Sequence, residues 1–145
     1  MTIVIDANVT VALVIDPMRG PVVEQHLRKW TKAGDTLHAP SLLRYEVANA
    51  LTRSVVANAI TSEDAEKAWQ RIAGMPITLH ELQDGQAVIA IARQLSRQNA
   101  YDAAYIALAQ ELKTNVWTLD GPLARNATGA ELPVQLIELA PSKTN

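Results

Sequence analysis

Acidic residues stand at four points of the chain where a buried segment ends or a helix begins: Asp6, Glu46, Asp102 and Asp120. Asp102 is the most unusual, because the surrounding residues 99–109 are alanine-rich and almost entirely apolar, which predicts a buried helix. A carboxylate in the first turn of such a helix requires a capping role, a cation or a metal ion. Taken singly, Asp6 and Asp120 are typical helix caps or turn residues, and Glu46 is typical of an exposed helix position. Only the placement of all four acids together predicts a functional site.

The elements that would position these acids alternate between strands and helices. Short β-branched or apolar runs predict strands over residues 3–5, 37–39, 77–80, 115–119 and 134–139. Helical periodicity predicts helices over residues 9–15, 21–32, 42–57, 62–72, 83–97, 99–109 and 123–127. Ser41 is the expected N-cap of the third helix, and Thr61 opens a capping box. This alternation predicts an α/β fold with a parallel sheet and helices on both faces.

A parallel sheet offers a reason for these acids to meet. The carboxyl ends of its strands and the starts of the following helices lie on the same edge. Carboxylates gathered there repel one another, and some retain protons, unless a cation is present. Mg²⁺ or Mn²⁺ suits such a site, because these hard ions prefer oxygen ligands, whereas a site without His or Cys suits zinc poorly. A metal of this kind can activate water for phosphodiester cleavage.

Composition limits the class of protein. The chain has 145 residues and no cysteine, which excludes a disulfide framework and thiolate chemistry. We expect a single domain over residues 1–140 and a polar tail over residues 141–145. The first residues do not form a signal peptide and no apolar run is long enough for a membrane span, so we expect a soluble, cytoplasmic protein. The net charge of −2 provides no global attraction toward nucleic acid.

Several segments together resemble the PIN-domain ribonucleases, most closely the VapC toxins of toxin–antitoxin pairs. They are Val4-Ile5-Asp6-Ala7-Asn8, Glu46, Tyr101-Asp102-Ala103-Ala104-Tyr105-Ile106-Ala107-Leu108-Ala109 and Trp117-Thr118-Leu119-Asp120-Gly121-Pro122-Leu123. The resemblance covers nearly the whole chain. It implies a three-layer α/β/α sandwich with an acidic pocket that binds Mg²⁺ or Mn²⁺ and cleaves RNA with metal-activated water.

The resemblance also implies roles and partners. Asp6, Glu46, Asp102 and Asp120 match the metal-binding and catalytic acids of the family, and Asn8 and Thr118 match polar positions that orient ligands or water. The implied partners are an RNA substrate, a cognate antitoxin that covers the pocket, and a second copy of the chain in a homodimer, with no membrane.

Other interpretations remain open at this point. A non-catalytic PIN-like interaction module would share the fold, although it has no need of the acids. Asp6-Ala7-Asn8-Val9-Thr10 resembles the opening motif of haloacid-dehalogenase-like phosphatases, but Asn8 replaces the second Asp. A nucleotide-binding α/β domain is disfavoured because no glycine-rich loop follows the first strand.

Side chains near the acids have further expected roles. Arg44, Arg53 and Arg125 are candidates for pairing with substrate or with the acids. A local basic cluster is a candidate for contacts with RNA phosphates but is expected to be mainly a solvated helix face; it consists of Arg19, Arg28, Lys29 and Lys32. Tyr105 is expected to be a packing residue rather than a catalytic one.

Overall fold

The computed structural model describes residues 1–97 and 100–139, and within these residues a five-stranded parallel sheet forms the centre of the molecule. The strands are β1 (Thr2–Ile5), β2 (Thr36–Pro40), β3 (Ile77–His80), β4 (Val116–Thr118) and β5 (Val134–Leu136), in the order β3-β2-β1-β4-β5. All five predicted strands are present. The last one ends earlier than predicted, although the Ile137 N–H still donates to the Thr118 carbonyl at 2.8 Å.

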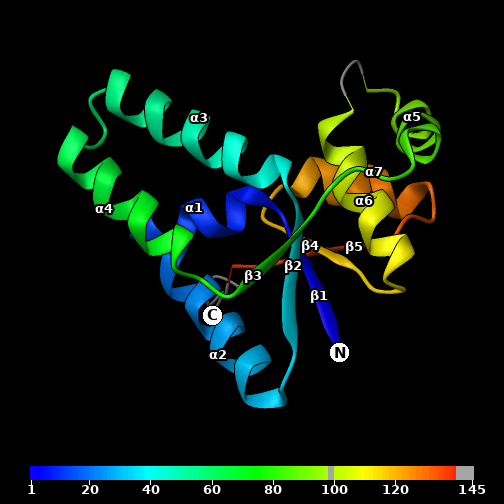
Figure 1. Ribbon diagram of the computed structural model, residues 1–145, viewed down its shortest axis with the longest axis horizontal. Helices are drawn as coiled ribbons and strands as arrows, with labels where there is room; N and C mark the ends of the chain where they lie inside the picture. The colour runs from blue at the N-terminus through cyan, green and yellow to red at the C-terminus, as the bar shows by residue number, and fades with distance from the viewer. Residues whose placement is uncertain (98–99, 140–145) are drawn as a thin grey trace, which may run out of the picture.

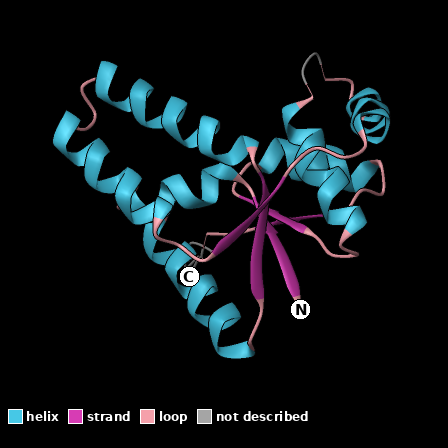
Figure 2. Ribbon diagram, in the orientation of Figure 1, coloured by secondary structure: helices cyan, strands magenta, loops and turns pink. Residues whose placement is uncertain are grey.

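The helices of the described residues are α1 (Ala7–Ile15), α2 (Gly20–Ala33), α3 (Leu42–Val56), α4 (Ser62–Ala73), α5 (Gly85–Gln94), α6 (Tyr101–Glu111) and α7 (Gly121–Gly129). Together with the sheet they form a three-layer α/β/α sandwich (Figures 1 and 2). On one face, α1 and α2 pack over a core that includes Ile5, Val23 and Trp30. On the other, α5, α6 and α7 cover a core that includes Val4 and Ile106. The predicted fold class is therefore confirmed.

Helices α3 and α4 form a hairpin that extends away from the sheet and packs on α1 (Figure 1). Thr61 begins α4 with the predicted capping box: its hydroxyl accepts from the Asp64 N–H at 3.0 Å, and the Asp64 carboxylate accepts from the Thr61 N–H at 3.1 Å. In the described residues, no helix is long and apolar enough to cross a lipid bilayer.

Ser41 is the N-cap residue of α3, as predicted, but its side chain makes no capping bond: its backbone is already helical, and its hydroxyl donates to Glu81 at 3.3 Å. Two predictions about helix ends were wrong. Helix α5 ends well before residue 97, since Ser96 adopts a left-handed φ of 54°. Helix α7 is longer than predicted, because Asp120 caps it early and it continues to Gly129. Residue 99, the predicted start of the following helix, and the predicted tail at 141–145 lie outside the described residues.

The strand order determines where a ligand can bind. From β1 the chain moves to β2 and β3 on one side, and then crosses over to β4 and β5 on the other. The carboxyl ends of β1 and β4 therefore lie side by side at the point where the order reverses, with Ile5 in register with Trp117. In open α/β sheets this switch point is the usual position of a ligand-binding crevice. Asp6 follows β1 directly, and Asp120 follows β4.

Candidate active site

A cleft of about 660 Å³ opens at this switch point. All the acids singled out from the sequence line it: Asp6 after β1, Glu46 from α3, Asp102 from the first turn of α6, and Asp120 after β4. They come from four segments that are far apart along the chain, and their charges influence one another. Because the segments differ, the shared cleft is a property of the fold and not of any local motif.

Asp6 is held by a network of polar side chains at the bottom of the cleft. It is only 8% exposed, and its Oδ2 accepts hydrogen bonds from Thr118 Oγ1 at 2.8 Å and Asn8 Nδ2 at 3.3 Å. Asn8 also donates to Thr118 Oγ1 at 3.0 Å and accepts from the Leu119 N–H at 3.1 Å. Thr118 Oγ1 accepts from the Asp120 N–H at 3.1 Å, so this one buried hydroxyl joins the two strand-end acids. Asp6 makes no side-chain capping bond to α1.

Burial and like charges nearby disfavour the charged forms of Asp6, Glu46 and Asp102. The pKa of Asp6 is raised to about 7, chiefly by burial and then by the nearby charges of Asp102 and Glu46, against the opposing effect of the Thr118 hydrogen bond. Burial likewise raises the pKa of Glu46 and of Asp102 above their usual values. Raised pKa values clustered in one cleft are typical of a functional site.

The sequence-based reasoning missed the hydrogen bond that Tyr105 makes to Glu46. Tyr105 was expected only to pack, and it is 2% exposed in the core, but its hydroxyl also donates to Glu46 Oε1 at 2.6 Å. This bond joins α6 to α3 and fixes the Glu46 side chain at the edge of the cleft. Tyr105 lies three residues after Asp102 on α6, and this helical spacing was the available signal that it shares a face with the acid.

Asp120 has a structural task as well as a place in the cleft. Its Oδ1 accepts from the Leu123 N–H at 3.0 Å and so caps α7. The capping interpretation of Asp120 is therefore correct, and it leaves the second carboxylate oxygen for another role.

The donor set of the cleft fits a hard divalent cation. Every candidate ligand is a carboxylate oxygen, and within the described residues none of these acids forms a salt bridge with Lys or Arg. Within the described residues, no group of three or more His, Cys, Asp and Glu side chains is arranged to hold a metal ion, so the acids share the cleft without forming a ready ligand set. An open, oxygen-lined cleft suits Mg²⁺ or Mn²⁺, because Mg²⁺ keeps several waters and uses few protein ligands.

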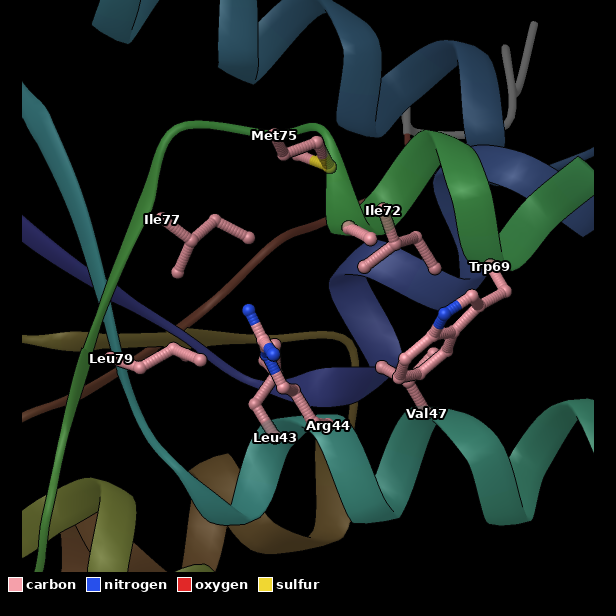
Figure 3. A pocket seen from close by; sticks show the side chains of 9 residues that line it. Leu43, Arg44, Val47, Trp69, Ile72, Met75, Ile77 and Leu79 are labelled. Carbon is pink, nitrogen blue, oxygen red and sulfur yellow. The ribbon is translucent and has the colours of Figure 1, made fainter.

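The fold places the three candidate arginines, Arg44, Arg53 and Arg125, in three different surroundings. Arg53 lines the acidic cleft. Arg44 instead extends from the other side of α3 toward a cavity of about 30 Å³ enclosed by residues such as Leu79 and Ile72 (Figure 3). That space has room for a few water molecules at most, so it is too small for a substrate. Arg125 borders a hollow beside Trp117, whose ring packs 5.4 Å from that of Trp30.

Comparison with known proteins identifies the class to which this fold and site belong. The PIN domain profile matches residues 3–128. The chain therefore belongs to the PIN domain family, as the sequence motifs predict, rather than to the haloacid-dehalogenase-like phosphatases.

Individual relatives agree with this assignment. Ribonuclease VapC12 of Mycobacterium tuberculosis is 31% identical over 125 residues, which cover 86% of this chain and 91% of the relative. The crystal structure of PAE2754 from Pyrobaculum aerophilum has a TM-score of 0.69 at 20% identity, and covers 94% of this chain and 84% of that one. The structure of VapBC2 from Rickettsia felis, bound to a DNA fragment from its promoter, has a TM-score of 0.66 at 10% identity, and covers 94% and 98%.

Proposed function

We propose that the chain is a divalent-metal-dependent endoribonuclease and the toxin of a VapBC-type toxin–antitoxin pair. The observation that carries the proposal is the meeting of Asp6, Glu46, Asp102 and Asp120 in one cleft at the switch point of a PIN fold. The similarity to Ribonuclease VapC12 over most of both chains supports RNA as the substrate. A non-catalytic module would gain nothing from burying Asp6 among like charges, a placement that costs stability.

The residues of the chain have distinct tasks in this proposal. Asp6, Asp102 and Asp120 would hold one or two Mg²⁺ or Mn²⁺ ions, and Glu46 would complete the ligand set directly or through a water molecule. When bound, the ion supplies Lewis-acid activation of water and neutralises charge on the phosphodiester. Tyr105 holds Glu46 in place through the 2.6 Å hydrogen bond.

The network around Asp6 positions its carboxylate. Thr118 and Asn8 both donate to Oδ2, and the Ala7 backbone N–H also bonds to this carboxylate, so the orientation of the Asp6 side chain is fixed by the protein. Polar partners of this kind orient the acids that bind metal and are typical of metal sites. The two side-chain donors therefore support the role of Asp6 without contacting the substrate.

The proposal includes a partner protein. The Rickettsia felis structure is that of VapBC2 bound to promoter DNA, and the likeness in fold supports a cognate antitoxin for the present chain. A homodimer, which the family resemblance implies, stays a prediction that sedimentation of the purified chain would test.

Cleavage of single-stranded RNA by the purified chain tests the function. We expect cleavage with Mg²⁺ or Mn²⁺, none with EDTA, and a loss of about 100-fold or more in Asp6→Asn and in Asp102→Asn. Asp64→Asn is the matched control, because Asp64 caps α4 outside the cleft and the same chemical change there is expected to preserve cleavage. Full activity of the Asp6 and Asp102 variants, or cleavage that persists in EDTA, would contradict the proposal.

A further inference from the structure

The side chains that line the acidic cleft are negatively charged at the switch point, and a positively charged one follows further along α3. One stripe of α3 lines the cleft, formed by Glu46, Ala50 and Arg53 at a spacing that keeps them on the same face of the helix. Glu46 and Arg53 are seven residues apart, which corresponds to about 10 Å along the helix axis. The cleft therefore runs from the carboxylates at the switch point to a cation two turns further along α3.

Arg53 has no carboxylate partner in the described part of the chain. Within residues 1–97 and 100–139, neither a salt bridge nor a hydrogen bond involves its guanidinium group. Its distance along α3 separates it from Glu46, although both line one cleft. A guanidinium group in that position is suited to a ligand that enters the cleft rather than to a structural ion pair.

Arg19 provides a second cation on another wall of the cleft, in the connection between α1 and α2. Its Nε donates to Asp16 Oδ2 at 2.7 Å, and Asp16 Oδ1 accepts from the backbone N–H groups of Met18 and Arg19. These bonds hold the Arg19 side chain in one orientation. Since Asp16 engages Nε, the two terminal nitrogens of the guanidinium keep their donor capacity.

Small and branched apolar side chains line the wall near these cations. They are Val11, Ile15, Ala50 and Ile60. This surface suits the sugar or base of a nucleotide, while the two guanidinium groups suit its phosphate, because a planar guanidinium binds phosphate oxygens through two parallel hydrogen bonds.

We propose that Arg53 and Arg19 form a phosphate subsite that binds the backbone of an RNA strand next to the phosphodiester at the acids. This inference rests on the proposed function, because it assigns RNA as the ligand. The physical need is electrostatic: the acids repel a polyanion, and Arg53 offsets that repulsion further along the cleft. Arg19 is paired with Asp16, which lines the same cleft, so its contribution is the directed N–H donors of its terminal nitrogens rather than net charge.

The salt dependence of RNA binding tests the subsite directly. Binding of a short fluorescein-labelled single-stranded RNA is followed by anisotropy in Mg²⁺, using the Asp6→Asn chain so that cleavage does not interfere. Each phosphate contact contributes about 0.7 to the slope of log affinity against log salt for a single strand. We expect Arg53→Gln and Arg19→Gln each to reduce the slope by about that amount, and Arg53→Lys to retain most of it.

Arg71→Gln in the same background is the matched control. Arg71 lies in the last turn of α4, as Arg53 lies in the last turn of α3, but it does not line the cleft. Its substitution removes the same charge and is expected to leave the slope unchanged. Thermal unfolding of each variant checks that the fold is retained.

The outcomes separate this subsite from the proposed nuclease activity. If the chain with Asp6 intact cleaves RNA and Arg53→Gln changes neither the slope nor the KM, the subsite is overturned and the nuclease stands. If cleavage is absent but binding still depends on Arg53, the nuclease proposal fails and the subsite stands. If Arg53→Gln impairs binding of an antitoxin but not of RNA, the cleft end is a protein-binding surface and our inference is wrong.

Discussion

Replacing Asp6 with Asn should make the metal-free protein more stable at neutral pH. A carboxyl pKa displaced from 3.8 to about 7 by burial corresponds to about 4 kcal/mol. The folded state binds a proton that the unfolded state has lost, so stability falls as the pH rises from about 4 to about 7. Asn cannot ionise, and its side-chain oxygen can still accept from Thr118, so it avoids this cost.

The assay is urea unfolding in EDTA at pH 4 and pH 8, followed by tryptophan fluorescence. We expect Asp6→Asn to be about 1–4 kcal/mol more stable than the parent chain at pH 8, and nearly equal to it at pH 4. Glu46 and Asp102 also have raised pKa values and remain in both proteins, so the difference between the two curves reports Asp6 together with its electrostatic coupling to these two acids. A variant less stable than the parent at pH 8 would refute the reasoning.

Asp16→Asn is a control for which the expected change in stability at pH 8 has the opposite sign. The Arg19 side chain beside Asp16 lowers the pKa of that carboxyl, so its charged form stabilises the fold above its unfolded pKa. The Asn variant should therefore lose stability at pH 8. Mg²⁺ should raise the stability of the parent chain at pH 8 and raise that of Asp6→Asn much less, because a ligand stabilises a protein through its binding to the folded state.

Other substitutions test the supporting contacts. Tyr105→Phe removes the donor to Glu46, so we expect a loss of about 1–2 kcal/mol in urea unfolding, a reduced kcat, and an acid limb of the pH–rate profile shifted to higher pH, because that hydrogen bond lowers the Glu46 pKa. Thr118→Val removes the hydroxyl that joins Asp6 and Asp120; we expect slower cleavage and a further rise in the Asp6 pKa, measured by the pH dependence of unfolding. Thr61→Ala breaks the capping box of α4 outside the cleft; it should cost about 1 kcal/mol in thermal unfolding while the cleavage rate is retained.

Much of the architecture follows from local patterns. Ile3-Val4-Ile5 followed by Asp6 indicates both a buried strand and the edge where its acid lies, and the structure agrees. Asp102 lies in the first turn of α6 as predicted. The strand order does not follow from such patterns, because it depends on which face each crossover covers. It is this order that places β1 beside β4.

The details of the site depend on contacts between distant residues. The bond from Tyr105 to Glu46 spans 59 positions. The spacing from Asp102 indicates the helix face on which Tyr105 lies, but a single sequence does not identify its distant partner. The arginines of α3 are different. At about 100° per residue, Arg53 lies close to the face of Glu46 and Arg44 lies nearly opposite. Helical geometry alone separates the cleft arginine from the one that lines the small cavity, as the structure shows.

Direct measurement of Mn²⁺ binding tests the central claim that these acids form one divalent-ion site. Electron paramagnetic resonance detects free Mn²⁺ during a titration of the purified chain, its Asp6→Asn and Asp102→Asn variants, and the Asp64→Asn control. We predict saturable binding to the parent chain and the control, and at least about tenfold weaker binding to the two cleft variants. Equal binding by all of these proteins would contradict the account.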